Sequence, residues 1–167
     1  QQAVKINPRS GTAFYNMGLL YLGQKNMEKA REYLEISVGL DADSFEPHVA
    51  LSRLYAQENL YDQAIAEISE AIKLENDKPS LHLTLGTLLL ESGQEEKAVK
   101  TFKKVVDLFP QNFSVQIRIA DWYYTKGMLE ESFETYRVAE TLDSENPVVQ
   151  ARLGKIYLEK KEITKAQ

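Results

Sequence analysis

The chain has 167 residues, a net charge of −5 at neutral pH and no cysteine. Without cysteine it has no disulfide, no thiolate metal ligand and no cysteine nucleophile. The acidic balance is the opposite of the basic excess typical of nucleic-acid-binding proteins, and the apolar runs are too short to span a bilayer. We therefore expect no nucleic-acid partner and no membrane insertion. The compartment stays unknown, with the cytoplasm favoured and the periplasm the alternative.

Residues of the same type return every 34 positions along the chain. A small residue recurs at Gly18, Ser52, Gly86, Ala120 and Gly154. A large residue, tyrosine in four cases, recurs at Tyr21, Tyr55, Leu89, Tyr123 and Tyr157. Alanine or serine recurs at Ala30, Ala64, Ala98, Ser132 and Ala166. Repetition at one fixed period predicts a stack of similar structural units.

Each unit contains two helical patterns separated by a short polar turn. In the first unit the apolar residues Phe14, Met17 and Tyr21 are three and four positions apart, so they share one helix face. We expect the first helix of each unit near residues 12–23, 46–57, 80–91, 114–125 and 148–159. We expect the second helices near 27–40, 61–74, 95–108 and 129–142, with a further one beginning near residue 162.

The recurring residues have a physical reason within such a unit. A small residue on the first helix and an alanine on the second allow the two helices to approach closely, and a tyrosine covers the contact. One hairpin cannot bury its apolar stripe alone, so it stacks on the next hairpin.

This combination of a 34-residue period with small, tyrosine and alanine positions resembles the tetratricopeptide repeat. The resemblance implies an all-α, right-handed α-solenoid of stacked antiparallel helix hairpins. It covers nearly the whole chain as one continuous domain, which we read as a fragment of a longer array. We expect the end of a preceding repeat at 1–10, four repeats at 11–44, 45–78, 79–112 and 113–146, and a partial fifth repeat at 147–167.

Two positions depart from the family pattern. The place of the family's tryptophan is taken by Phe14, His48, His82, Gln116 and Gln150. The closing proline is present at Pro8 and Pro110 but is replaced by Ala42, Asn76 and Ser144. These departures indicate a divergent natural array.

The two histidines, His48 and His82, lie one repeat apart and are the first candidates for chemistry. A metal site or an acid–base pair would need a third group that no spacing supplies, so we favour a packing role for both. No phosphate-binding glycine loop, HExxH motif or nucleophile elbow is present. We therefore expect no catalytic residue, no metal site and no cofactor, and the chain is predicted not to be an enzyme.

A block of charge connects two of the second helices. In the repeat register Lys97 matches Glu131 and Lys100 matches Glu134, which predicts exposed ion pairs between neighbouring helices. The alternative is a patch that binds a partner.

In this family the first helices line a concave groove that takes an extended peptide or a partner helix. The positions of this sequence that match the groove are Tyr15, Asn16, Leu19, Val49, Arg53, Leu83, Thr84, Thr87, Ile117, Arg118, Asp121, Tyr124, Arg152 and Lys155. Many are apolar, and the arginines make the groove mildly basic, so we expect a ligand segment with apolar side chains and at least one carboxylate. The alternative is that the arginines pair with acidic neighbours, for example Arg118 with Asp121 one turn later.

The resemblance thus predicts a non-catalytic scaffold or adaptor that binds a peptide segment or a partner subunit. Two alternatives stay open at this point. The chain could be the substrate-recruiting arm of a larger enzyme, or a module that associates with copies of itself through its terminal repeats.

Overall fold

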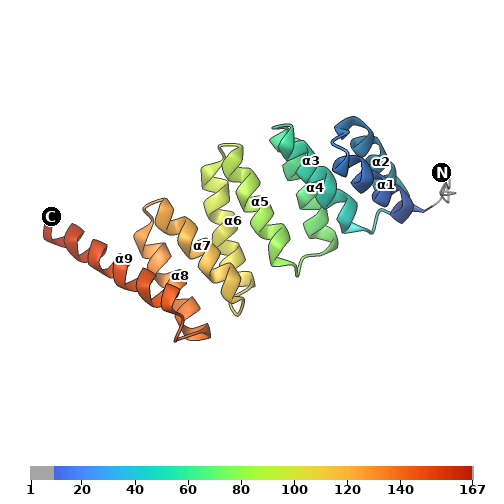
Figure 1. Ribbon diagram of the computed structural model, residues 1–167. Helices are drawn as coiled ribbons and strands as arrows, with labels where there is room; N and C mark the ends of the chain where they lie inside the picture. Colours follow the sequence, from blue (N-terminus) through green and yellow to red (C-terminus); the bar gives the residue numbers. More distant parts are fainter. Residues whose placement is uncertain (1–9, 167) are drawn as a thin grey trace. The chain divides into compact units, whose positions relative to one another are not determined.

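The computed structural model describes residues 10–166, with side chains as far as residue 161, and this part of the chain contains nine helices and no strand (Figure 1). The helices are α1 (Gly11–Gly23), α2 (Met27–Leu40), α3 (Phe45–Gln57), α4 (Tyr61–Leu74), α5 (Pro79–Glu91), α6 (Glu95–Leu108), α7 (Phe113–Thr125), α8 (Leu129–Leu142) and α9 (Pro147–Ala166). The chain divides into two compact units, Gln1–Thr101 and Phe102–Gln167, with the boundary inside α6. The repeat end expected at residues 1–10 lies outside the described residues, apart from Ser10.

The first helices begin one residue earlier than expected, whereas α2, α4, α6 and α8 have the expected bounds. Polar residues in front of the first helices account for several of these starts. The side chain of Ser10 accepts a hydrogen bond from the backbone nitrogen of Ala13 at 3.2 Å, and Asn112 accepts one from Val115 at 3.1 Å. Such caps satisfy backbone donors that have no partner within the helix.

Every turn within a hairpin has one residue in the left-handed conformation, at the same repeat position. These residues are Lys25, Asn59, Gly93 and Gly127, with φ between 57° and 76°. Asn and Gly adopt this conformation at little cost, as expected from their presence in the turns, but Lys25 carries a β-carbon that is strained there.

The turn expected near residues 160–161 is absent, because α9 continues without a break to Ala166. Lys161 stands at the position of the left-handed residues, and neither Gly nor Asn is present to favour a turn there. Lysine, glutamate and alanine are good helix formers, so continuing the helix is preferred over a left-handed turn at this point.

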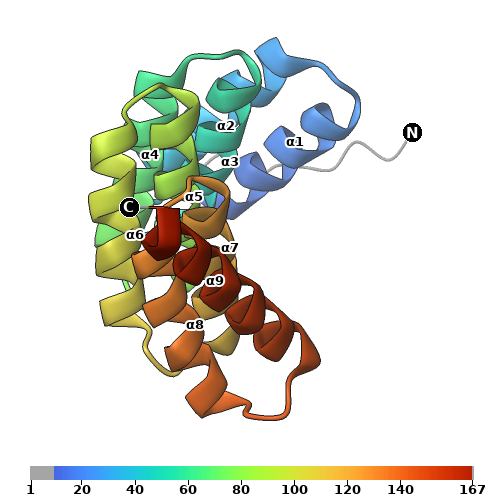
Figure 2. The same cartoon turned by 90° about the vertical axis from the view of Figure 1, so that its left-hand side faces the viewer.

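The first unit contains two hairpins whose helices lie antiparallel and side by side, α1 with α2 and α3 with α4, followed by α5 and the first half of α6 (Figures 1 and 2). Its core contains Leu34, Leu54 and Ile68, all fully buried. The recurring small residues allow the two helices of a hairpin to approach closely. In α1 a β-carbon placed on Gly18 would lie 2.7 Å from the side chain of Leu34, so only glycine fits there without a shift.

The second unit has a core of the same kind in α7, α8 and the first part of α9, with Tyr136, Val149 and Ile156 fully buried. The aromatic ring of Phe102, on the last turns of α6, lies 4.6 Å from that of Trp122. The Ser132 hydroxyl donates to the backbone oxygen of Ala120 at 2.9 Å across the α7–α8 contact.

The position that holds tryptophan in the family has a shared structural role here. His82, Gln116 and Gln150 each hydrogen bond through the side chain to the backbone oxygen of the residue six positions earlier. The acceptors are Asn76, Pro110 and Ser144, at 2.9, 3.4 and 3.0 Å. These side chains therefore fix the connection that precedes their own helix.

His48 differs in its partner, because its Nδ1 lies 2.7 Å from Glu67 Oε2 on α4. Both His48 and His82 are buried, as a packing role requires.

Candidate partner-binding surfaces on the first helices

A cavity of about 190 Å³ lies in the first unit, between α1, α3 and the start of α5. We call it the first-helix pocket. It is lined by Tyr15, Leu19, Leu22, Phe45, Glu46, Val49, Ala50, Arg53, Lys78, Ser80 and Leu81. The structure thus brings together four of the predicted groove residues, Tyr15, Leu19, Val49 and Arg53, around one apolar hollow.

Phe45 and Lys78 are among the lining residues of this pocket that the sequence analysis missed. The ammonium of Lys78 lies 5.2 Å from the centre of the Phe45 ring, in the geometry of a cation–π contact. The repeat pattern pointed to the middle of the first helices, whereas these two residues stand at helix beginnings. Phe45 matches Pro79 in the repeat register and Lys78 matches Ser44, so the period gave no signal for this contact.

The other predicted groove residues of the first unit do not line this pocket. Leu83 is only 8% exposed, and Asn16 is exposed elsewhere on α1. The hydroxyls of Thr84 and Thr87 donate to the backbone oxygens of Ser80 and Leu83 in their own helix, at 2.8 and 3.0 Å. These hydroxyls already have acceptors, which leaves the pocket as the better defined part of this surface.

Arg53 is exposed at the rim of the first-helix pocket, and no carboxylate among residues 10–161 forms an ion pair with it. The acidic residue of the lining, Glu46, accepts a hydrogen bond from the Ser44 hydroxyl at 2.9 Å. The pocket therefore combines an apolar interior with an uncompensated guanidinium, a group suited to bidentate binding of a carboxylate.

In the second unit the predicted residues Asp121 and Arg152 pair with each other, with Nε 3.3 Å from Oδ1. The same Oδ1 accepts a hydrogen bond from the buried Tyr136 hydroxyl at 2.6 Å. Burial and the Asp121 carboxylate raise the pKa of Tyr136, so that its hydroxyl remains a donor. The pairing of Arg118 with Asp121 that the sequence suggested is wrong, because Arg152 and Tyr136 occupy this carboxylate.

Two cations lie over the ring of Tyr124, Arg152 at 5.6 Å and Lys155 at 5.1 Å from its centre. The Tyr124 hydroxyl donates to Glu159 at 2.6 Å, and its interaction with Lys155 raises the pKa of that lysine. A cavity of about 360 Å³, lined by Pro147, Val148, Ala151, Arg152 and Lys155, lies on the same helix. The polar groups around Tyr124 are thus largely satisfied by contacts with one another.

The last two predicted residues of the second unit differ in exposure. Ile117 packs half-buried against the core of α7 and α8. Arg118 is exposed, and within the described residues it makes no ion pair. Arg118 therefore resembles Arg53 as an unpaired cation on a first helix.

Two further properties concern the described residues as a whole. None of their helices combines the length and hydropathy needed to cross a bilayer. No three of their histidine, aspartate or glutamate side chains are grouped closely enough to hold a metal ion.

The fold is shared with several solved structures. YrrB, described as "a TPR protein with an unusual peptide-binding site", is 18% identical, with a TM-score of 0.67 over 95% of this chain and 82% of YrrB. MamA from Desulfovibrio magneticus RS-1 is 21% identical, with a TM-score of 0.65 over 93% and 88% of the two chains. PilF from Pseudomonas aeruginosa is 20% identical, with a TM-score of 0.63 over 91% and 69%.

No curated protein matches the chain in sequence. Sequence models of the tetratricopeptide repeat match residues 11–44 and 55–117, more than half of the chain. Repeats of this kind stack into an all-α solenoid and serve as scaffolds for protein–protein interaction. From the period, the stacked helix hairpins and these two matches we conclude that the chain belongs to the tetratricopeptide repeat family.

Proposed function

We propose that this chain is a non-catalytic scaffold that binds an extended peptide segment of a partner protein at its first helices. The first-helix pocket is the proposed anchor, and the uncompensated Arg53 at its apolar rim is the observation that carries the proposal. A peptide with an apolar side chain for the hollow and a carboxylate for Arg53 matches both features.

The apolar part of the pocket supports this assignment. Tyr15 and Val49 are only half-buried and Leu19 is 41% exposed, although all three lie on helices that bury their opposite face in the core. Removal of such surface from water is the main favourable term in peptide binding, whereas the guanidinium selects which peptide binds.

Arg118 offers a second unpaired cation for the same class of ligand in the second unit. Arg152 contributes less, because Asp121 and the Tyr124 ring already engage its guanidinium. YrrB, which has a peptide-binding site and shares this fold, supports a peptide as the ligand class.

The experiment is to select peptides from a random-sequence library displayed on phage and to measure their affinities by fluorescence anisotropy. The selected peptides should share an apolar residue near an aspartate or glutamate. The Arg53→Ala variant should weaken their binding by about tenfold or more, because a carboxylate then loses its charged partner.

The matched control is Arg137→Ala. Arg137 is also an exposed arginine, but it lies on the second helix α8 and pairs with Glu140 at 2.8 Å. Its replacement should leave peptide binding unchanged. Selected peptides that bind Arg53→Ala and a Leu19→Ser variant as tightly as the parent chain would contradict the proposal.

Association with another copy of the chain is a second candidate, favoured by apolar side chains on α9. Val148, Tyr157 and Leu158 are 53%, 61% and 61% exposed. Light scattering over a range of concentrations tests this function. A mass that grows with concentration in the parent chain but not in Tyr157→Ser/Leu158→Ser supports it, and a constant monomer mass contradicts it.

A further inference from the structure

The hydroxyl of Tyr123 on α7 is buried without a hydrogen-bond partner among the described residues. The side chain is 1% exposed, and its oxygen meets no acceptor or donor at bonding distance. Buried polar groups are nearly always paired, so an orphan of this kind indicates a partner that the isolated chain does not supply.

The second repeat shows how this tyrosine position is satisfied elsewhere. There the equivalent residue, Tyr55, donates its hydroxyl to Glu35 at 3.1 Å, and Glu35 precedes it by 20 positions. In the fourth repeat the residue 20 positions before Tyr123 is Lys103. An ammonium has no lone pair to accept a hydrogen bond, so the same backbone leaves the Tyr123 hydroxyl without an acceptor.

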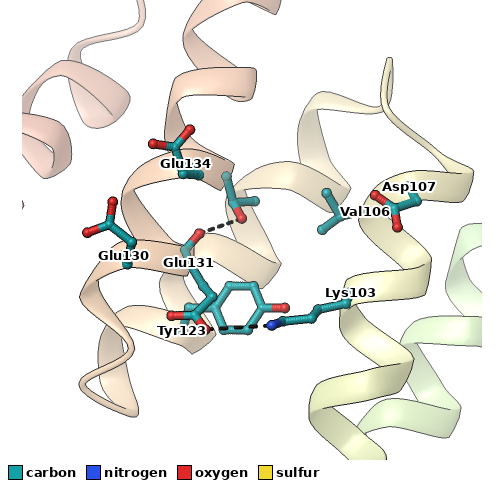
Figure 3. A pocket seen from close by; sticks show the side chains of 8 residues that line it. Lys103, Val106, Asp107, Tyr123, Glu130, Glu131 and Glu134 are labelled. Carbon is teal, nitrogen blue, oxygen red and sulfur yellow. Dashed lines mark hydrogen bonds and ion pairs between the residues drawn. The ribbon is translucent and has the colours of Figure 1, made fainter.

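Tyr123 forms part of a cavity of about 380 Å³ between the last turns of α6 and the first turns of α8, which we call the second-helix pocket. Its hydroxyl points toward the α6 side, where Lys103 and Val106 lie (Figure 3). The lining consists of Lys103, Val106, Asp107, Tyr123, Glu130, Glu131, Glu134 and Thr135. The volume falls in the range of ligand pockets, about 300–1,000 Å³.

The walls of this pocket carry an excess of negative charge. Glu131 pairs with Lys103 at 3.6 Å, rather than with Lys97 as the repeat register suggested, and Lys97 instead donates to Gln94. Glu130 pairs with Lys160 at 2.5 Å. Among residues 10–161, no cation forms an ion pair with Asp107 or Glu134.

From the orphaned hydroxyl and the acidic walls, we propose that the second-helix pocket binds a basic side chain of a partner polypeptide. The arginine or lysine of the partner pairs with Glu131, Glu134 and Asp107, and a backbone carbonyl of the same segment accepts the hydrogen bond of Tyr123. A polypeptide supplies both groups next to each other. An acidic ligand would be repelled by the four carboxylates of the lining.

The protonation of Tyr123 agrees with this role. Burial, together with the Glu131 and Asp107 carboxylates, raises the pKa of the Tyr123 phenol to about 12. The hydroxyl therefore keeps its proton at neutral pH and acts as a donor.

This site is separate from the first-helix pocket in residues and in ligand charge. The proposed function places an acidic peptide at Arg53, whereas the second-helix pocket takes a basic one. Either site can fail without the other, because they share no residue.

The test uses the 167-residue chain and three probes in a titration followed by backbone amide NMR shifts. The probes are N-acetyl-Gly-Arg-Gly-amide, the same tripeptide with citrulline in place of arginine, and the propylguanidinium ion. The arginine tripeptide should shift amides of residues 103–107 and 129–135 and bind more tightly than either other probe. Citrulline has the same shape without the charge, and propylguanidinium has the charge without a backbone carbonyl.

Variants connect the shifts to the proposed groups. Glu131→Gln/Glu134→Gln should weaken the arginine tripeptide by about tenfold, the loss expected for one charge pair. Tyr123→Phe should weaken it by roughly fivefold, as for one hydrogen bond, while it leaves the stability of the free chain unchanged or higher. The matched control Tyr55→Phe, in which the lost hydroxyl had an acceptor, should leave binding unchanged.

Several outcomes would overturn the proposal. Equal binding of the citrulline tripeptide would show that charge is not recognised, and equal binding of propylguanidinium would exclude a polypeptide. If amide shifts changed only in the first helices, the arginine tripeptide would bind at another site. The side chain of Glu134 is exposed, so it can be replaced without loss of folding. Unchanged binding of the arginine tripeptide to Glu134→Gln would show that this carboxylate does not bind the basic side chain.

Discussion

The hydroxyl of Ser52 donates a hydrogen bond to the backbone oxygen of Ala64, 2.8 Å away, at the buried contact between α3 and α4. The same contact in the fourth repeat has the two residue types exchanged. There Ser132 on the second helix donates to the oxygen of Ala120 on the first helix, at 2.9 Å. The buried contact between the two helices of a repeat therefore accommodates one serine hydroxyl, which can come from either helix.

This exchange predicts a swap that preserves stability. Ser52→Ala should lower the free energy of unfolding by about 1 kcal/mol, because one buried hydrogen bond is lost. Ser52→Ala/Ala64→Ser should recover most of that loss by copying the arrangement of Ala120 and Ser132. Denaturation in urea followed by circular dichroism measures both values. A double variant less stable than Ser52→Ala would show that the two contacts are not equivalent.

Gly18 and Gly154 occupy the same repeat position but differ in the space around them. A β-carbon on Gly18 would lie 2.7 Å from the side chain of Leu34, which is fully buried, whereas nothing lies within 4 Å of one on Gly154. Gly18→Ala should therefore lower the free energy of unfolding by about 1 kcal/mol, since overpacking exceeds the gain in helix propensity.

Gly154→Ala is the control for this prediction. It should raise the free energy of unfolding by about 0.5–1 kcal/mol, because alanine is the better helix former. The same urea titrations measure it, and a stabilising effect at both positions would mean that the α1–α2 contact adjusts to the added methyl group.

The helices and the buried positions could be predicted from the sequence because a 34-residue period repeats the same packing, whereas contacts between individual charged side chains could not. Glu131 meets Lys103 rather than Lys97, since the first turns of α8 lie beside the last turns of α6. The spacing fixes equivalent positions but not this offset between helices, and long side chains reach whichever partner is nearest.

Part of the candidate site was missed for a related reason. Phe45 and Lys78 contact each other from the beginnings of two first helices, where the periodic signal is weakest. The orphaned Tyr123 hydroxyl could be recognised only after the structure had shown that Glu35 satisfies its counterpart Tyr55. Once that pair is known, the lysine at position 103 is visible in the sequence.

Lys25 has a φ of 57°, the left-handed conformation that Gly127 adopts at the same repeat position. Lys25→Gly should raise the free energy of unfolding by about 1 kcal/mol, because a β-carbon costs about that much in this conformation. Gly127→Ala should lower it by a similar amount for the same reason. Thermal and urea denaturation test both, and a lower free energy of unfolding for Lys25→Gly would mean that Lys25 gains more from its side chain than its backbone loses.

Asp121 accepts the hydrogen bond of the fully buried Tyr136 hydroxyl, at 2.6 Å. Asp121→Ala should lower the free energy of unfolding by about 1–3 kcal/mol, because the phenol is left buried without an acceptor. In a Tyr136→Phe background the same substitution should cost much less. A double-mutant cycle measures the coupling, and additive effects would show that the two side chains act independently.

The raised pKa of Tyr123, about 12 against 10.0 for a free tyrosine, predicts a loss of stability at alkaline pH. Below about pH 10 both folded and unfolded chains hold this proton. As the pH rises from about 10 to about 12 the unfolded chain releases it first, so the folded state binds more protons and its stability falls.

Tyr123→Phe removes the group, and the free energy of unfolding should then fall less over this range. Tyr157→Phe, at a tyrosine that is 61% exposed, should follow the parent chain. Urea titrations at a series of alkaline pH values measure all three proteins, and parallel curves for Tyr123→Phe and the parent would show that this phenol does not hold its proton in the folded chain.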